Sequence, residues 1–77
     1  MSTTKHEVHW VGDAPTRCDW NTRHKITKTF VDGRTRRSGS WANMCLDCHR
    51  EHGIGLGIGR GQQYQKQLGG RWLKIAG

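Results

Sequence analysis

The alternation of apolar and polar residues at the start of the chain predicts a short strand or an ordered arm. Within residues 1–13, Val8 and Trp10, with His6, fall on one face of an extended segment. Gly, Asp, Pro and Asn then cluster around Cys18, a composition that is typical of turns. The arm is therefore expected to lead into a turn region that carries this cysteine.

A β-hairpin is predicted over residues 25–41. Strand-forming residues fill 26–31. Asp32-Gly33 is a strong signal for a two-residue hairpin turn, because Gly tolerates a positive φ and Asp tolerates it better than most residues. The returning strand is then expected at about 34–41, where arginines would keep an exposed edge from pairing with other chains.

A short helix of about two turns is predicted in 41–53, where Gly53 is a plausible stop and basic residues occupy the last turn. Glycine then recurs at every second position up to Gly61. This alternation predicts an irregular strand that packs its apolar side chains inward, namely Ile54, Leu56 and Ile58. Glycine at this density makes a regular helix unfavourable.

Two short strands are predicted at the end of the chain, on either side of Gly69-Gly70. Tyr64 in the first strand would supply apolar contacts. Trp72, with Leu73 and Ile75, would do so in the second.

The apolar content is low for a folded domain. Ile, Leu, Val and Phe make up 12 of the 77 residues, and the formal net charge is +7. Such a composition usually marks disorder, but four tryptophans oppose that reading, and we expect core packing for Trp41 and Trp72. Small domains with little core commonly need a metal or disulfides. We therefore expect residues 14–77 to form a single metal-stabilised α+β domain of β-hairpins and one short helix.

The cysteine count favours metal over disulfides. Three cysteines cannot all pair within one chain, and the opening "MSTTKHEVHW" shows no secretory signal. We therefore expect a reducing cytoplasm, where such cysteines more often bind metal. No apolar run reaches membrane-spanning length, so no membrane partner is expected.

The stretch "CLDCH" contains half of a metal site. Cys45 and Cys48 have the spacing of a zinc knuckle, in which two intervening residues let both sulfurs point at one ion. Cys18 is the expected third ligand, because it lies in a turn before the hairpin. The predicted cofactor is one structural Zn²⁺.

The fourth ligand is open on sequence alone. A regular first knuckle would place a cysteine at position 21, where this chain has Asn21, a poor ligand for zinc. We favour His24, three residues later. His52 is the alternative, since it follows Cys48 by one helical turn; water, Asn21 or His9 are the remaining choices.

The positive charge favours nucleic acid as the partner, because basic side chains neutralise phosphates. A host protein with an acidic surface is the alternative partner. Trp20, Trp41 or Tyr64 would be available to stack on unpaired bases. The basic residues selected as candidate nucleic-acid ligands are Arg17, Arg23, Lys25, Lys28, Arg34, Arg36, Arg37 and Arg60.

The stretch "FVDGRTRRSGSWANMCLDCHREHGIGLGIGRGQQYQKQ", together with "RWLKIAG", resembles a group of short phage-encoded proteins that carry a CxxC knuckle. The resemblance covers residues 18 to about 75. It implies a phage origin, the cytoplasm of the host and a zinc-ribbon or treble-clef-like fold, but it supplies no known activity. The chain departs from the group at Asn21, where the second cysteine is expected.

The stretch "ANMCLDCHREHG" more distantly resembles the second knuckle of His-Asn-His endonucleases. In those enzymes the hairpin supplies a histidine as the general base. Gly33 stands at the matching place in "VDGRT", so no group that activates water is evident there. We therefore expect a binding protein with no catalytic residues and no small-molecule substrate, and a degenerate nuclease of this type is the least favoured interpretation.

Overall fold

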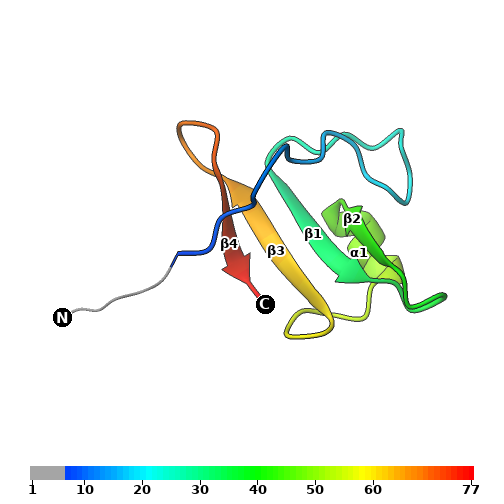
Figure 1. Ribbon diagram of the computed structural model, residues 1–77. Helices are drawn as coiled ribbons and strands as arrows, with labels where there is room; N and C mark the ends of the chain where they lie inside the picture. The colour runs from blue at the N-terminus through cyan, green and yellow to red at the C-terminus, as the bar shows by residue number, and fades with distance from the viewer. Residues whose placement is uncertain (1–6) are drawn as a thin grey trace.

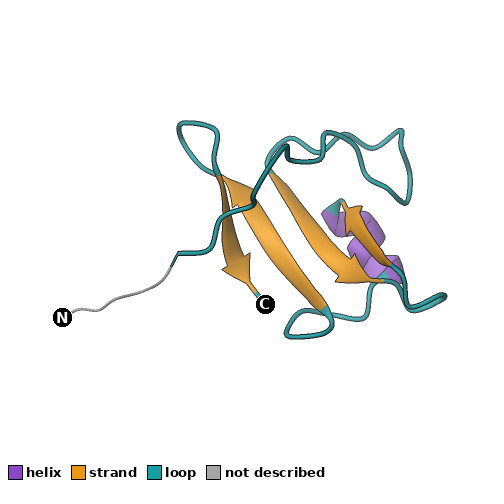
Figure 2. Cartoon of the chain, viewed as in Figure 1, coloured by secondary structure: helices purple, strands orange, loops and turns teal. Residues whose placement is uncertain are grey.

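The computed structural model describes residues 7–77, which form four antiparallel strands and one short helix. The elements are β1 (Thr29–Arg34), β2 (Trp41–Met44), α1 (Leu46–His52), β3 (Gly61–Lys66) and β4 (Trp72–Ala76). The strands make one sheet in the order β2-β1-β3-β4 (Figure 1). The predicted α+β class is thereby confirmed, and loops make up much of the rest of the chain (Figure 2).

Both outer strands of the sheet are covered by loops. Along β4, the Trp10 amide donates to the Trp72 carbonyl oxygen at 2.9 Å, and the Lys74 amide donates to the Val8 carbonyl oxygen at 2.7 Å. Along β2, the Asp19 amide donates to the carbonyl oxygen of Asn43 at 2.8 Å. Covered edges of this kind leave fewer free backbone groups for pairing with other chains.

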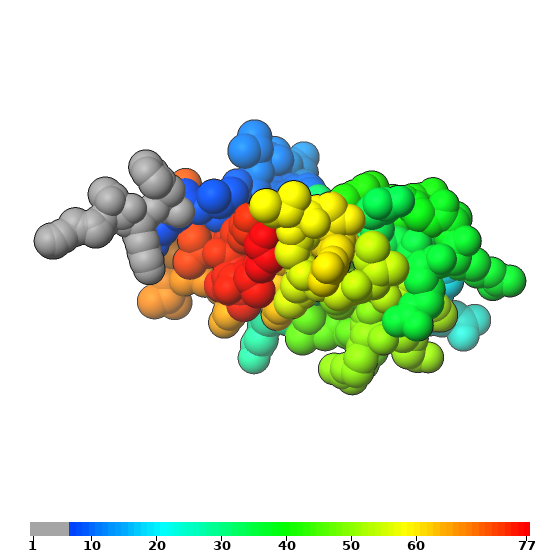
Figure 3. All heavy atoms as spheres, turned by 90° about the horizontal axis from the view of Figure 1, so that it is seen from below, coloured from blue at the N-terminus to red at the C-terminus, as the bar shows by residue number. Residues whose placement is uncertain are grey.

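Helix α1 and the N-terminal arm lie on opposite sides of the sheet. Figure 3 shows the arm (blue) on one side of the molecule and the helix segment (yellow-green) on the other. The helix side is closely packed at Gly33, where an added Cβ would lie 3.4 Å from the imidazole of His49 and 3.3 Å from the Arg60 carbonyl oxygen. No helix in the described part of the chain is long and apolar enough to cross a membrane.

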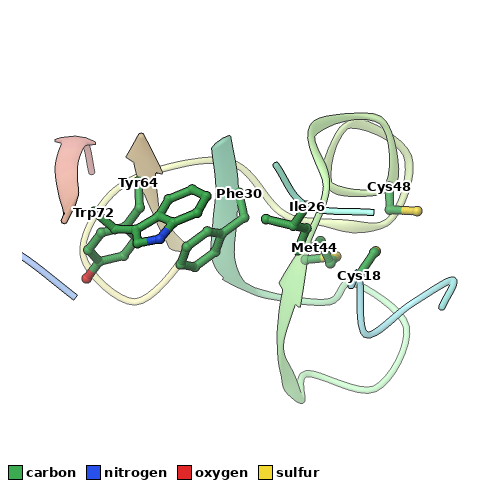
Figure 4. Close-up of a cluster of buried hydrophobic side chains, with 7 residues drawn as sticks. All are labelled: Cys18, Ile26, Phe30, Met44, Cys48, Tyr64 and Trp72. Carbon is green, nitrogen blue, oxygen red and sulfur yellow. The ribbon is translucent and has the colours of Figure 1, made fainter. Parts of the chain in front are cut away.

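The core runs from an aromatic group at one end to a sulfur-rich group at the other (Figure 4). The fully buried Phe30 ring stacks on Tyr64 with centroids 5.3 Å apart, and it makes edge contacts with Trp10 and Trp72 at 5.2 Å each. Met44 and the neighbouring Ile26, Cys18 and Cys48 continue the core toward the helix. The prediction that Trp72 packs in the core is confirmed.

The turn predicted at Asp32-Gly33 is wrong, because both residues lie inside β1. Phe30 and Val31 on opposite faces of this strand are both fully buried, so tertiary packing holds the chain extended past the local turn signal. The hairpin instead turns between Thr35 and Ser40, where the Thr35 amide donates to the Ser40 carbonyl oxygen at 2.8 Å. The turn includes Gly39, whose positive φ of 75° favours glycine.

The returning strand and the helix start are consequently shifted. "WANM" forms β2 and pairs with β1 in the register Arg34↔Trp41 to Val31↔Met44, whereas we expected it to open the helix. The helix begins only at Leu46, but it stops before Gly53, as predicted. Trp41 remains 47% exposed on the outer strand, so the prediction that it packs in the core is wrong.

The glycine-rich segment does not form the predicted strand. It is a loop in which Gly55, Gly57 and Gly59 all adopt positive φ, and that conformation is incompatible with a strand. Ile58 is 95% exposed, and Ile54 and Leu56 are 39% and 37% exposed, so none of these three side chains is buried as predicted. By contrast, the two final strands are confirmed as β3 and β4, which pair in antiparallel fashion.

One consequence of the shifted turn is a half-buried carboxyl on β1. Burial, and then the charge of Asp19, raise the pKa of Asp32 above its ordinary value. A raised pKa means that the folded state favours the protonated form of Asp32 over the ionised form. The protonated carboxyl therefore stabilises the fold at low pH, and this stabilisation is lost as the pH rises through the folded-state pKa. At pH 7 this carboxyl therefore destabilises the fold.

Asp32→Asn is accordingly expected to raise the thermal unfolding midpoint at pH 7, and the gain over the natural protein should shrink as the pH is lowered toward the raised pKa. Thermal melts followed by circular dichroism at several pH values would measure it. Asp47→Asn, at an exposed site, is the matched control and should change little. A variant at position 32 that melts below the natural protein at pH 7 would contradict this account of the carboxyl.

Candidate metal centre

A small loop places Cys18 and His24 side by side. The Cys18 amide donates to the His24 carbonyl oxygen at 2.9 Å, and the Ile26 amide donates to the Thr16 carbonyl oxygen at the same distance. We call residues 16–26 the knuckle loop. Asn21 sits at its tip, where its Oδ1 accepts a hydrogen bond of 3.0 Å from the Arg23 amide. The asparagine thus stabilises the turn in which a second cysteine was expected.

The start of helix α1 supplies the other two cysteines. Cys45 follows β2 directly and is the N-cap residue of the helix, and Cys48 lies in the first turn. Residues three apart on a helix share a face, so both sulfurs point toward the knuckle loop. Asp47 in the first turn and basic residues in the last turn suit the helix dipole.

These two segments bring the three sulfurs together. The Sγ atoms of Cys18, Cys45 and Cys48 all lie within 4.8 Å of one another, and the three side chains form the group of potential metal ligands in the described part of the chain. All three are free thiols. The protein can therefore coordinate a metal ion at this cluster.

His24 reaches the same cluster. Its Nδ1 lies 3.4 Å from the Cys45 sulfur and 3.5 Å from the Cys48 sulfur. The ring is exposed on its outer side, whereas Cys18 and Cys48 are buried. A nitrogen at this position closes the side of the cluster that faces solvent.

The other histidines of the helix are engaged elsewhere. The His52 ring stacks on Trp20, with centroids 4.1 Å apart and an angle of 23° between the planes. The Nε2 atom of His49 lies 3.0 Å from the carbonyl oxygen of Gly55 and so fixes the glycine-rich loop to the helix. His9 lies on the arm, where it pairs with Leu73 of β4.

The thiols have unequal pKa values. Burial would raise the pKa of Cys18, but hydrogen bonds from the backbone amides of Cys45, Asn21 and Trp20 outweigh it, and the pKa falls below its usual value. Burial, followed by the contacts with Cys45 and Cys18, raises the pKa of Cys48 to about 12. Sulfurs this close repel one another when ionised, and a cation placed among them would relieve that repulsion.

The basic residues selected from the sequence are all exposed but do not form one cluster. Several of them anchor loops: Arg36 donates from Nη2 to the Gly53 carbonyl oxygen at 3.1 Å, Arg34 donates to Gly39 at 3.3 Å, and Arg17 donates to Thr22 at 3.2 Å. The others lie on the knuckle loop, the segment that follows it, the hairpin turn and the glycine-rich loop, namely Arg23, Lys25, Lys28, Arg37 and Arg60.

The positive charge is hardly neutralised within the protein. Among the described residues 7–77, the single ion pair joins Arg50 to Asp47 at 3.2 Å, and both side chains are largely exposed. Of the aromatic residues considered for base stacking, Tyr64 is buried, whereas Trp41 and Trp20 are 47% and 38% exposed.

Comparisons of this chain with known protein families, curated proteins and solved structures gave no match.

Proposed function

We propose that this protein is a zinc-stabilised module that binds nucleic acid through its basic surface, with Cys18, Cys45, Cys48 and His24 as the zinc ligands. The observation that carries the zinc site is the pair of distances from His24 Nδ1 to the two sulfurs, 3.4 and 3.5 Å. Ligands at the usual Zn–S and Zn–N lengths with tetrahedral angles lie about 3.6 Å apart. His24 therefore stands at nearly the spacing from Cys45 and Cys48 that a shared zinc ion requires, and Cys18 lies within 4.8 Å of both of these sulfurs.

The ligand types favour zinc over the other common ions. Three thiolates and an imidazole form a soft, tetrahedral set that suits zinc, whereas calcium and magnesium prefer oxygen ligands. Four protein ligands would leave no open position for substrate, which makes the role structural. The order of a knuckle loop with Cys18 and His24, a hairpin, and a helix with Cys45 and Cys48 supports a treble-clef-like interpretation of the fold.

Nucleic acid is the preferred partner because most Lys and Arg side chains among residues 7–77 are exposed, and within this range only Arg50 makes an ion pair. A compact chain of net charge +7 attracts polyanions, and each phosphate that it neutralises releases a counterion. The exposed ring of Trp41 would offer a surface for stacking on a base. We propose binding rather than catalysis, since Gly33 leaves the β1 position without a general base.

A titration of labelled duplex and single-stranded DNA against the purified protein at 50 and 200 mM salt would test this function. The expected result is binding whose affinity falls steeply with salt, because basic groups meet phosphates. Binding no tighter than micromolar at low salt, with little dependence on salt, would contradict the proposal.

A protein partner is the second candidate, and the exposed Trp41 and Trp20 favour it. Tryptophan is enriched at the energetic centres of protein interfaces, and a basic surface suits an acidic partner. The resemblance to phage-encoded proteins stays a prediction; under it, this partner would be a host polymerase, nuclease or defence complex. Co-purification with one host protein, alongside weak DNA binding, would support this second function.

A further inference from the structure

Three shallow hollows adjoin one another on the surface of the protein. The first, of about 540 Å³, lies between α1 and the glycine-rich loop and includes Leu46 and Arg50 in its wall. The second, of about 320 Å³, shares both of these residues and extends to Lys28. The third, of about 410 Å³, shares Lys28 and extends to Lys66 on β3. We call this continuous surface the track.

The track is strongly basic. Its walls carry one carboxylate, that of Asp47, which already pairs with Arg50 at the surface. Five cationic side chains face it, contributed by residues 25–28 at and after the end of the knuckle loop, the hairpin turn, helix α1 and strand β3: Lys25, Lys28, Arg36, Arg50 and Lys66. Neither Arg50 nor Lys66 stood out in the sequence, because each is isolated there and only the fold brings them beside the others.

The first hollow differs from the rest of the track, because apolar side chains contribute to its wall. Leu46, Ile54 and Leu56 line it together with the imidazole of His49 and the amide of Gln63. His49 is held by its contact with Gly55, and Arg36 is held by Gly53, so two polar groups of this wall have fixed positions. Its volume falls within the usual range of ligand sites.

We propose that the track binds single-stranded nucleic acid, with the phosphates along its five cations and one unstacked base in the hollow beside α1. This assignment rests on the proposed function and names its substrate class. A duplex presents phosphates and groove edges while the faces of its bases stay stacked inside, so it has no base face to lie in this hollow. An unpaired base can leave the strand and lie against apolar walls while its edge meets polar groups.

The track adjoins the metal centre, since Cys45 lines the second hollow beside Lys25. The metal ligands therefore fix the position of the knuckle loop relative to the helix, and with it the spacing of the cations on either side. Binding of the single strand is expected to require the metal-loaded protein.

Fluorescence anisotropy with a labelled oligothymidylate would test the assignment on the zinc-loaded full chain. The track variant is Lys28→Ala/Lys66→Ala. The matched control is Arg71→Ala/Lys74→Ala, which removes the same charge at positions that line none of the three hollows and that were not candidate nucleic-acid ligands. If each of the five cations meets one phosphate, the slope of log affinity against log salt should be about −3.5 for the natural protein and about −2.1 for the track variant. The control should stay near −3.5.

The outcomes separate this assignment from the function on which it rests. A control variant that loses as much affinity and slope as the track variant, or more, would overturn the track while leaving nucleic-acid binding intact. A natural protein that prefers duplex to single strand would overturn the base in the hollow. A natural protein that binds neither DNA form would overturn the proposed function, and the track with it. Zinc content and circular dichroism equal to those of the natural protein identify both variants as folded.

Discussion

Stripping the metal ion with a chelator is expected to unfold the protein. The core is small: eight apolar side chains are buried among the described residues, and two of them are cysteines of the metal cluster. A structural zinc ion contributes about 10–16 kcal/mol of apparent binding free energy in small domains, which exceeds what a core of this size supplies. Apart from the cysteine cluster, the knuckle loop is tied to β2 by the two hydrogen bonds between Asp19 and Asn43, so much of its attachment depends on the ion.

Circular dichroism and tryptophan fluorescence during chelation would measure this loss. Both signals should change together, and added zinc should restore them. Chelator that has been saturated with zinc beforehand is the control and should have no effect. Cys48→Ala should show the unfolded spectrum without any chelator, because it removes a buried ligand from the helix. Unchanged spectra after complete metal removal would refute the dependence of the fold on the ion.

Replacing His24 by alanine is expected to weaken zinc binding by roughly 100- to 1,000-fold, since one of four ligands would be lost from a site of the strength above. His52→Ala is the matched control, because it removes a histidine that stacks on Trp20 and leaves the cluster untouched. Its cost should be limited to the stacking contact, about 1 kcal/mol of stability. The zinc affinity of the control should stay at that of the natural protein.

Competition with a chromogenic chelator of known affinity would give both zinc dissociation constants. His24→Cys adds a useful third variant, because a thiolate at this position can replace the imidazole and should restore tight binding. A large loss of zinc affinity in His52→Ala, with none in His24→Ala, would identify His52 and not His24 as the fourth ligand.

The features that sequence reasoning predicted correctly depend on chemistry that acts over a few residues. The spacing of Cys45 and Cys48 fixes both on one face of a helical turn, and Cys18, the third cysteine expected from the sequence, lies in the same cluster. Gly53 ends the helix, and Gly69-Gly70 separates the last two strands. Each of these features depends little on how the other segments of the chain pack together.

The features that were missed depend on packing between distant segments. Asp32-Gly33 favours a turn only when no other segment packs against the strand. Here Phe30 and Val31 are buried on opposite faces and Gly33 packs against His49, so the chain stays extended. The glycine-rich loop failed as a strand because its positive φ values let it curl back toward Gly61, where the chain re-enters the sheet. Neither the packing of His49 against Gly33 nor the return of the glycine-rich loop to Gly61 can be inferred from the local sequence.

The basic surface illustrates the same limit. The arginines of the hairpin stood out because they are close together in sequence, yet only Arg36 of the three lines the track, and Arg34 donates a hydrogen bond to the carbonyl oxygen of Gly39. The side chains that line one continuous surface come from four separate segments. A binding face assembled in this way becomes visible only once the sheet order and the helix position are known.

The central claim is that one zinc ion ties the knuckle loop to the start of helix α1. X-ray absorption at the zinc edge, on protein of measured metal content, tests it most directly. The account predicts one zinc per chain, with three sulfur ligands at about 2.3 Å and one nitrogen ligand at about 2.0–2.1 Å. A cooperatively folded protein that contains no metal, or a bound metal without sulfur neighbours, would contradict it.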